Sequence, residues 1–150
     1  MTMAAAIESR PAMQAAASAS RLARVQVFQT FDTAKAAWDI LESGPGSLST
    51  PYQRFAFVSS WQRYVGHALG LEPCIVVGYD THHQPLCLFP LGAKSDGGFR
   101  SARFLGGKHS TFNMALWDRD FAAHATEADL DAIFDAARSQ GGVDVLSLVQ

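Results

Sequence analysis

The fold is decided by the stretch Pro73–Leu91, which reads PCIVVGYDTHHQPLCLFPL and contains two apolar runs around a polar turn. The first run, Cys74–Tyr79, is almost continuously apolar, as is typical of a strand buried on both faces. Asp80–Gln84 is polar and suits a turn, and Leu86–Leu91 returns as a second strand. The pattern predicts a β-hairpin in the interior of a sheet.

The two cysteines, Cys74 and Cys87, lie one on each strand of this hairpin. A turn centred near His82 and His83 places Cys74 opposite a residue near Leu91 and away from Cys87. Two cysteines without a CxxC pair are also too few for a disulfide scaffold. We therefore expect two free thiols in a reducing cytoplasm.

A strand and a helix are predicted before the hairpin. Arg24–Phe28 alternates apolar and polar residues, which indicates a half-buried strand. Asp32 or Thr33 is a candidate N-cap for a helix that Ser43–Gly46 ends. Four residues at helical spacing are expected to form its inward face: Ala34, Ala37, Trp38 and Leu41.

A second helix is predicted between Thr50 and the hairpin. Thr50 is a candidate N-cap, and Pro51 suits the first helical position. Gln53, three residues after Thr50, could complete a capping box with it. The apolar residues that keep helical spacing are Phe57, Val58, Trp61, Tyr64, Val65 and Ala68. Gly66 or Gly70 is expected to end this helix.

After the hairpin, Ser95–Gly98 indicates a second turn and Phe99–Leu105 another strand, which Gly106 and Gly107 end. Phe112–Trp117 is expected to be a short extended stretch. Thr126 and Asp129 then begin a helix with a capping box and an apolar stripe of Leu130, Ile133, Phe134 and Ala137. Gly141 and Gly142 end it, and Val143–Val149 is predicted as a terminal strand.

The predicted order is a strand, two helices, three strands with a short fourth, a helix and a last strand. This order indicates an α+β (α/β-like) domain with one mixed, mostly antiparallel sheet flanked by helices. We expect the domain to cover residues 21–150, because residues 1–20 are rich in Ala and Ser and are typical of a flexible tail.

Composition excludes several classes of protein. Of the 150 residues, 48% are hydrophobic and 17% charged, which disfavours disorder and coiled coil. A net charge of −2 provides no general attraction for nucleic acid. The longest apolar runs fall far short of the roughly 20 residues that a membrane span needs. We therefore expect a cytoplasmic protein without a membrane span or a nucleic-acid partner.

Polar side chains gather in the loop Gly106–Asn113, where Lys108, His109, Ser110 and Asn113 follow one another closely. Such a loop can bind a carboxylate or phosphate, and His109 is a candidate base for an attacking amine. The alternative is a solvated loop whose side chains satisfy local backbone groups. Tyr52 and Gln53 are candidates for lining a substrate cleft, with a capping role as the alternative for Gln53.

No metal site is predicted. His82 and His83 are adjacent and point in opposite directions on an extended segment, and His67 and His124 have no partner at ligand spacing. Surface histidines are therefore the expected interpretation of all four.

The element order is similar to the first half of the GNAT acyltransferase fold. Several short sequence motifs, in the order in which they occur, add to this similarity. They are Trp38–Leu41, Ser49–Gln53, Trp61, Pro90-Leu91, Phe104–Gly107 and Asp144–Leu148. From about residue 22 to the end, the chain resembles bacterial GNAT-like acetyltransferases associated with cellulose biosynthesis, which are related to Fem-type aminoacyl transferases. Members of that family are typically about twice this length, so we expect an N-terminal half whose C-terminal GNAT-like half is missing.

This resemblance implies transfer of an acetyl group from acetyl-CoA to an amine or hydroxyl on a small or polysaccharide-related acceptor, without a metal. The GNAT phosphate loop has the form Gln/Arg-x-x-Gly-x-Gly/Ala, which makes Arg103, Gly106 and Gly107 candidates for binding the cofactor. Lys108 departs from that pattern, and a plain strand-ending turn is the alternative. The implied roles are catalytic for His109 and substrate-binding for Tyr52, Gln53, Lys108, Ser110 and Asn113. A non-catalytic recognition or scaffolding domain is the second hypothesis.

Overall fold

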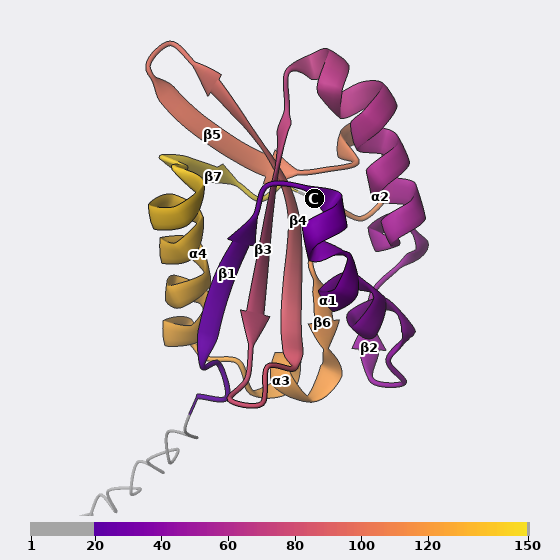
Figure 1. Cartoon of the computed structure of the whole chain (residues 1–150), viewed down its shortest axis with the longest axis vertical. Coiled ribbons are helices and arrows are strands. Elements are labelled where there is room, and N and C mark those ends of the chain that lie inside the picture. Colours follow the sequence, from indigo (N-terminus) through magenta and orange to yellow (C-terminus); the bar gives the residue numbers. More distant parts are fainter. Residues whose placement is uncertain (1–19, 150) are drawn as a thin grey trace, which may run out of the picture.

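The computed structural model describes residues 20–149, so the predicted tail lies outside the described residues apart from Ser20. A seven-stranded sheet forms the centre of the molecule, with helices on both of its faces (Figure 1). The strands are β1 (Arg24–Phe28), β2 (Ser47–Leu48), β3 (Glu72–Tyr79), β4 (Pro85–Asp96), β5 (Phe99–Phe104), β6 (Leu116–Asp118) and β7 (Val145–Ser147).

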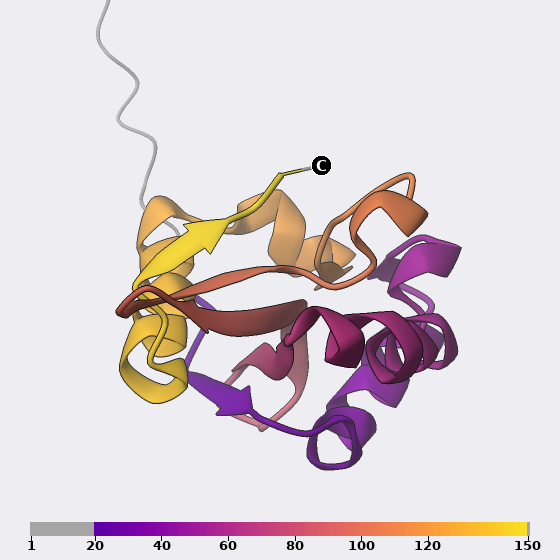
Figure 2. The same ribbon diagram turned by 90° about the horizontal axis from the view of Figure 1, so that it is seen from above.

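The helices are α1 (Phe31–Ser43), α2 (Phe55–Trp61), α3 (Arg119–His124) and α4 (Glu127–Gly141). Four shorter helical turns accompany them: the 3-10 turns η1 (Pro51–Gln53), η3 (His67–Leu69) and η4 (Gly107–His109), and the π-helical turn η2 (Gln62–Gly66). Seen from above, α4 lies on one side of the sheet and α1 and α2 lie on the other (Figure 2).

The main path of the sheet is β1-β3-β4-β5-β7, and β6 joins β4 and β2 beside it. Among the described strands, β5 with β7 is the only parallel pair, and the other pairs are antiparallel. The predicted α+β class with a mixed, mostly antiparallel sheet is therefore confirmed.

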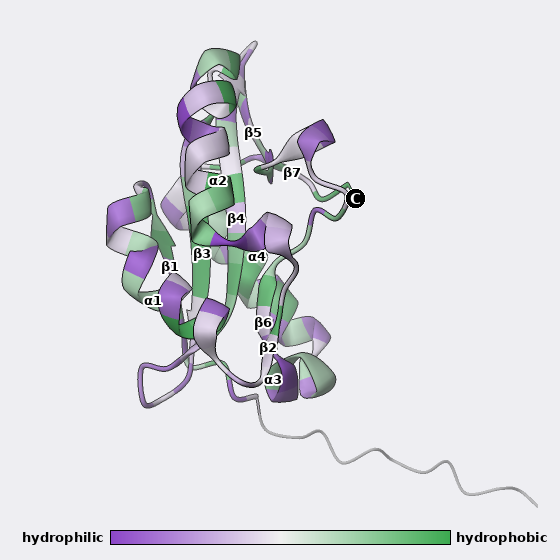
Figure 3. Ribbon diagram, turned by 90° about the vertical axis from the view of Figure 1, so that its right-hand side faces the viewer, coloured by the Kyte–Doolittle hydropathy of each residue, from purple (hydrophilic) through white to green (hydrophobic). Residues whose placement is uncertain are grey.

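The hairpin of β3 and β4 has the predicted register, with Cys74 opposite Leu91. Successive residues of β3 enter two different cores: Val76 packs on the α4 side, while Ile75 and Val77 pack on the α1 side. Burial on both faces explains why the apolar run is continuous. Figure 3 shows the hydrophobic residues along the central strands. Both cysteines are free and buried, as expected, and burial raises the pKa of Cys87 to about 12.

Helix α1 buries the four predicted residues, Ala34, Ala37, Trp38 and Leu41. Its N-cap, however, is Thr30, whose side chain accepts a hydrogen bond from the backbone N–H of Thr33. The predicted caps, Asp32 and Thr33, lie inside the helix. A cap residue needs extended backbone, and Thr30 has it, with φ −138° and ψ 151°.

The predicted second helix is interrupted twice. The capping box of Thr50 and Gln53 is confirmed, but it begins the short turn η1, and Arg54 returns to extended backbone before α2 starts. The π-helical turn η2 then inserts one extra residue, which rotates the following side chains by about 100°. Tyr64 is consequently 72% exposed, although it lies on the predicted apolar stripe. The segment ends at Gly70, with φ 72°.

The long strand β4 has two different neighbours along the same edge. Its second half pairs with β5, and Leu88 near its start pairs with Leu116 of β6. Residues 106–115 therefore leave the sheet between β5 and β6 and return to it. The predicted stretch Phe112–Trp117 enters the sheet only at Leu116. Both β2 and α3 were missed by the sequence prediction.

Helix α4 and strand β7 complete the fold. The capping box of Thr126 and Asp129 is confirmed, and Gly142 ends α4 in the left-handed conformation. Strand β7 is shorter than the predicted Val143–Val149 and pairs with β5 at the end of the main path. Val145 and Val149 are exposed at this edge.

Candidate functional site

The candidate site starts where β5 ends and the loop 106–115 leaves the sheet. Gly106 and Gly107 turn the chain with φ values of 106° and 48°. A Cβ on Gly106 would lie 3.1 Å from Cβ of Ser110 and 3.4 Å from Oδ1 of Asn113. Glycine at this position therefore lets the loop fold back closely on itself.

Arg103, Gly106 and Gly107 follow strand β5, but no long helix begins directly after them. The turn leads into η4, which is only three residues long. The next long helix, α4, begins only at Glu127, behind the capping box of Thr126 and Asp129. The strand–loop–helix geometry of a phosphate loop is thus replaced by a strand-ending turn, because the chain first returns to the sheet as β6.

Gln53 connects the loop to the turn η1 through hydrogen bonds. Its Nε2 donates to the carbonyl of Phe112 at 2.6 Å, and its Oε1 accepts from the backbone N–H and the hydroxyl of Thr50 at 2.9 and 2.7 Å. Gln53 is only 2% exposed. The capping role of Gln53 is therefore confirmed, and the same side chain holds the loop through Phe112.

Other loop side chains also bind locally. Thr111 Oγ1 donates to the hydroxyl of Tyr52 at 3.1 Å, so Tyr52 braces the loop and does not line the pockets described below. Ser110 Oγ donates to the carbonyl of Phe112, and Asn113 Nδ2 to the carbonyl of Gly107 at 3.3 Å. Asn113 Oδ1, in contrast, is buried and has no hydrogen-bond partner in the described part of the chain.

His109 is tied to α2 by a hydrogen bond between side chains. Trp61 Nε1 donates to His109 Nδ1 at 3.0 Å. An indole N–H can only donate, so Nδ1 is the acceptor and the neutral imidazole carries its proton on Nε2. His109 therefore offers a hydrogen-bond donor at Nε2. Acting as a base through Nδ1 would cost it the bond from Trp61.

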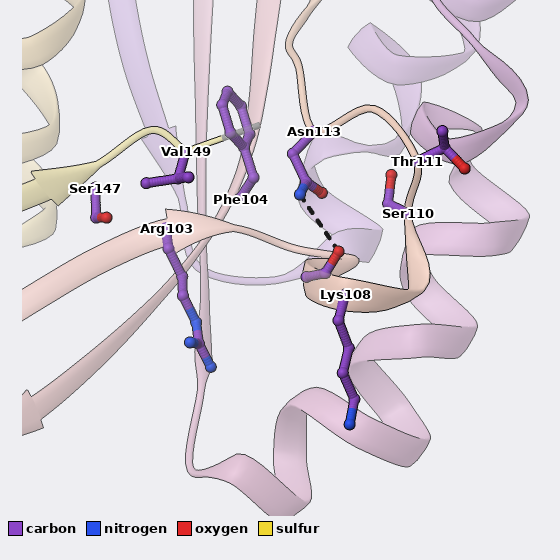
Figure 4. Close-up of a pocket in the computed structure, with 9 residues that line it drawn as sticks. Arg103, Phe104, Lys108, Ser110, Thr111, Asn113, Ser147 and Val149 are labelled. Carbon is purple, nitrogen blue, oxygen red and sulfur yellow. Dashed lines mark hydrogen bonds between the residues drawn. The ribbon is translucent and has the colours of Figure 1, made fainter.

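Two pockets adjoin at the start of the loop. The first, which we call the strand pocket, has a volume of about 480 Å³ and lies between the end of β5, the loop and the segment after β7 (Figure 4). Besides Arg103, Gly107 and Lys108, its polar lining is Ser110, Thr111, Asn113 and Ser147. Phe104 and Val149 are its apolar lining.

The second pocket, the helix pocket, has a volume of about 530 Å³. It lies between the loop and the helical segment α2–η3, from which Trp61, Val65 and Leu69 line it. Its other lining residues are Arg103, Gly107, Lys108 and His109. Arg103, Gly107 and Lys108 thus belong to both pockets and form their junction.

The junction is positively charged. Arg103 and Lys108 are exposed, and neither forms an ion pair with an acidic side chain of residues 20–149. The lining of both pockets contains no Asp or Glu from the described residues. Figure 4 shows the charged ends of Arg103 and Lys108 directed to the same side, away from Ser147 and Val149.

The structure thus brings together most of the predicted site residues. Five of them line the strand pocket: Arg103, Gly107, Lys108, Ser110 and Asn113. His109 lines the helix pocket, whereas Tyr52, Gln53 and Gly106 support the loop from outside both pockets. Sequence reasoning missed Val65, Leu69, Ser147 and Val149 as pocket-lining residues. Trp61 is buried in the core, as predicted, and also lines the helix pocket. Helical spacing alone could not distinguish a core position from a pocket wall on α2.

No group of three or more His, Cys, Asp or Glu side chains within residues 20–149 is arranged to hold a metal ion. His67, His82, His83 and His124 are all exposed. None of the helices in this part of the chain combines the length and apolar character that crossing a membrane requires.

Comparison with known proteins gives little beyond the geometry. No protein-family model and no curated protein sequence matches the chain. Among solved structures, it is similar to an acetyltransferase of Trypanosoma brucei, with 12% sequence identity and a TM-score of 0.41. The similarity covers 85% of this chain and 82% of that protein.

Proposed function

We propose that this protein binds acetyl-CoA in the strand pocket and transfers the acetyl group to an amine or hydroxyl of an acceptor in the helix pocket. The observation that carries the proposal is the junction of the two pockets at Arg103, Gly107 and Lys108. A transfer reaction needs two molecules held in contact, and adjoining pockets provide that proximity. The reaction class is the one implied by the resemblance to GNAT-like acetyltransferases.

The strand pocket suits the extended arm of a coenzyme A thioester. The parallel pairing of β5 and β7 ends at Arg103 and Ser147, and the pocket opens where the pairing stops. Asn113 Oδ1 is a buried acceptor without a partner in the described residues, which an amide N–H of the arm would satisfy. The hydroxyls of Ser110, Thr111 and Ser147 add further donors and acceptors along the same pocket.

The junction supplies groups for the chemistry of acyl transfer. When the acceptor nitrogen or oxygen attacks the thioester carbonyl, the new bond to carbon forms, the C–S bond breaks, and coenzyme A leaves as its thiolate. The carbonyl oxygen becomes negative on the way. The Nε2–H of His109 is a donor that would stabilise this charge, and the acceptor's proton passes to solvent.

Isothermal titration with acetyl-CoA tests the proposal. We expect micromolar binding to the unmodified chain, and no binding to Ser147→Tyr, whose added ring would fill the strand pocket. Ser147→Thr is the matched control and should bind as the unmodified chain does. Absence of heat at millimolar acetyl-CoA would overturn the proposal and favour the recognition alternative. Product formation with amine acceptors then tests transfer.

A further inference from the structure

We infer that the helix pocket is a binding site for an amphipathic anion, meaning a carboxylate or phosphate carried on an aromatic or aliphatic body. The inference rests on the proposed function in one respect, because the anion is assigned as the acceptor of the acyl group. The site itself is argued only from the side chains that line the pocket.

One wall of the helix pocket is apolar. It consists of Trp61, Val65 and Leu69, which lie along the segment α2–η3. Leu69 is 45% exposed, so apolar surface is open to solvent here. Trp61 is only 7% exposed and its one polar atom is bonded to His109, so Val65 and Leu69 supply most of the open apolar surface. An aromatic or aliphatic group would cover this wall and gain from leaving water.

The other described side chains that line the helix pocket carry hydrogen-bond donors and no acidic group. The guanidinium of Arg103 and the ammonium of Lys108 donate only, and the bond from Trp61 makes Nε2 of His109 a donor as well. A ligand group that meets Arg103 and Lys108 must accept hydrogen bonds. Carboxylates and phosphates do so, whereas an ammonium group would find neither an acceptor side chain nor a favourable charge.

Charge leads to the same ligand class. No acidic side chain of the described residues lines the helix pocket or pairs with Arg103 or Lys108. Both charged ends point to the same side in Figure 4, and both residues line the helix pocket. The volume of about 530 Å³ is in the range of small-molecule pockets. The acceptor is therefore a small amine or alcohol that also carries an acidic group and an apolar body.

Titration with phenyl phosphate tests the inference, with two comparison ligands. Inorganic phosphate has the charge without the apolar body, and benzylamine has the ring with the opposite charge. We expect phenyl phosphate to bind about tenfold more tightly than inorganic phosphate, which corresponds to about 1.4 kcal/mol. Benzylamine should not bind. Equal affinity for the two phosphates, or binding of benzylamine, would overturn the inference.

A matched pair of variants locates the ligand. Leu69→Glu places a carboxylate on the apolar wall and should abolish phenyl phosphate binding, while Leu69→Gln, of the same size and uncharged, should reduce it less. Arg103→Gln should weaken binding about tenfold. Arg119→Gln removes an exposed cation of α3, away from the pocket, and should have no effect. If Leu69→Glu does not fold, the Arg103→Gln variant still tests the inference. An unchanged affinity of Arg103→Gln for phenyl phosphate would overturn it.

Failure of this inference and failure of the proposed function give different results. Ser147→Tyr blocks the strand pocket only, so it should still bind phenyl phosphate while losing acetyl-CoA. If the unmodified chain binds phenyl phosphate but not acetyl-CoA, the proposed function alone is overturned. Normal acetyl-CoA binding without phenyl phosphate binding would overturn the inference alone.

Discussion

Helix α4 and the segment α2–η3 both cover the central sheet, but they are built differently. Helix α4 is regular from its capping box at Thr126 to the left-handed Gly142, and it buries Ile133 and Ala137. The segment α2–η3 begins without a side-chain cap and passes from α-helix through a π-helical turn to a 3-10 turn. The regular helix lines no part of either pocket, whereas the irregular one forms a wall of the helix pocket.

The difference shows how an irregular helix can create a site. Because η2 inserts one residue, the apolar stripe of α2 no longer faces the core throughout, and Tyr64 is left exposed. Trp61, just before η2, is buried and still reaches His109. We therefore expect changes in α4 to affect stability alone and changes in η2 to affect both stability and binding.

The largest loss of stability is expected for Ile133→Ala in α4. Ile133 is 1% exposed, and removing its buried methyl groups should lower the free energy of unfolding by about 2–5 kcal/mol. Urea denaturation measures this change. Asp131→Ala, on the exposed side of the same helix, is the control and should stay within about 0.5 kcal/mol. Weaker phenyl phosphate binding by folded Ile133→Ala would contradict the proposed separation.

A smaller loss is expected for Gly66→Ala in η2. The new Cβ would lie 2.1 Å from Gln62 Oε1 and 3.1 Å from Cζ3 of Trp61. Gln62 cannot easily move, because it is buried and its Nε2 donates to the carbonyl of Leu71 at 2.6 Å. Overpacking of this kind costs about 1–3 kcal/mol, and here it should also displace Trp61.

Two measurements check the Gly66 prediction: urea denaturation for stability and phenyl phosphate titration for binding. Gly46→Ala is the matched control, since its Cβ would meet only Asp118 Oδ2 at 3.8 Å. We expect Gly46→Ala to bind phenyl phosphate normally. If Gly66→Ala did so too, η2 would not position the pocket wall.

The cap of α4 should respond to pH. Burial of Asp129 raises its pKa, but hydrogen bonds from Ser20 and Thr126 outweigh this effect, and the pKa is lower than usual. The ionised carboxylate therefore stabilises the folded state above about pH 4, and this contribution is lost as the pH falls through the folded-state pKa. Asp129→Asn should cost about 1 kcal/mol at neutral pH and flatten the acid side of the stability curve.

Urea denaturation between about pH 2 and pH 7 measures this dependence, and the range brackets the usual pKa of an aspartate. Asp131→Asn changes an exposed carboxylate of the same helix and serves as the control. Identical pH profiles for Asp129→Asn and the unmodified chain would show that Asp129 does not carry the effect.

The smallest effect is expected for alkylation of the two cysteines in the β3–β4 hairpin, which both helical segments cover. Burial raises the pKa of Cys74 and raises that of Cys87 to about 12, so neither thiol forms much thiolate at neutral pH. We expect iodoacetamide to leave both unmodified in the folded protein and to alkylate both in urea. Mass spectrometry counts the adducts. Rapid alkylation without urea would show that the hairpin opens on its own.

Patterns that depend on near neighbours were readable from the sequence. The inward face of α1 and the capping box of Thr126 are set by residues within a few positions of one another, and the short turn Asp80–Gln84 sets the register of Cys74 opposite Leu91. The interruption at Arg54 and the turn η2 were not readable, because the local apolar spacing there is compatible with a continuous helix. Strand β2 was missed because two residues carry too little periodicity to indicate a strand.

The sequence by itself determined the class of the sheet, the central hairpin and the cluster of Lys108 and His109 in one loop. Only the tertiary structure decided that Trp61 bonds His109 and that Ser147 lies beside Arg103. The physical reason is the range of the interactions. Turns, caps and amphipathic faces are local, whereas a pocket forms from side chains that packing brings together from distant parts of the chain.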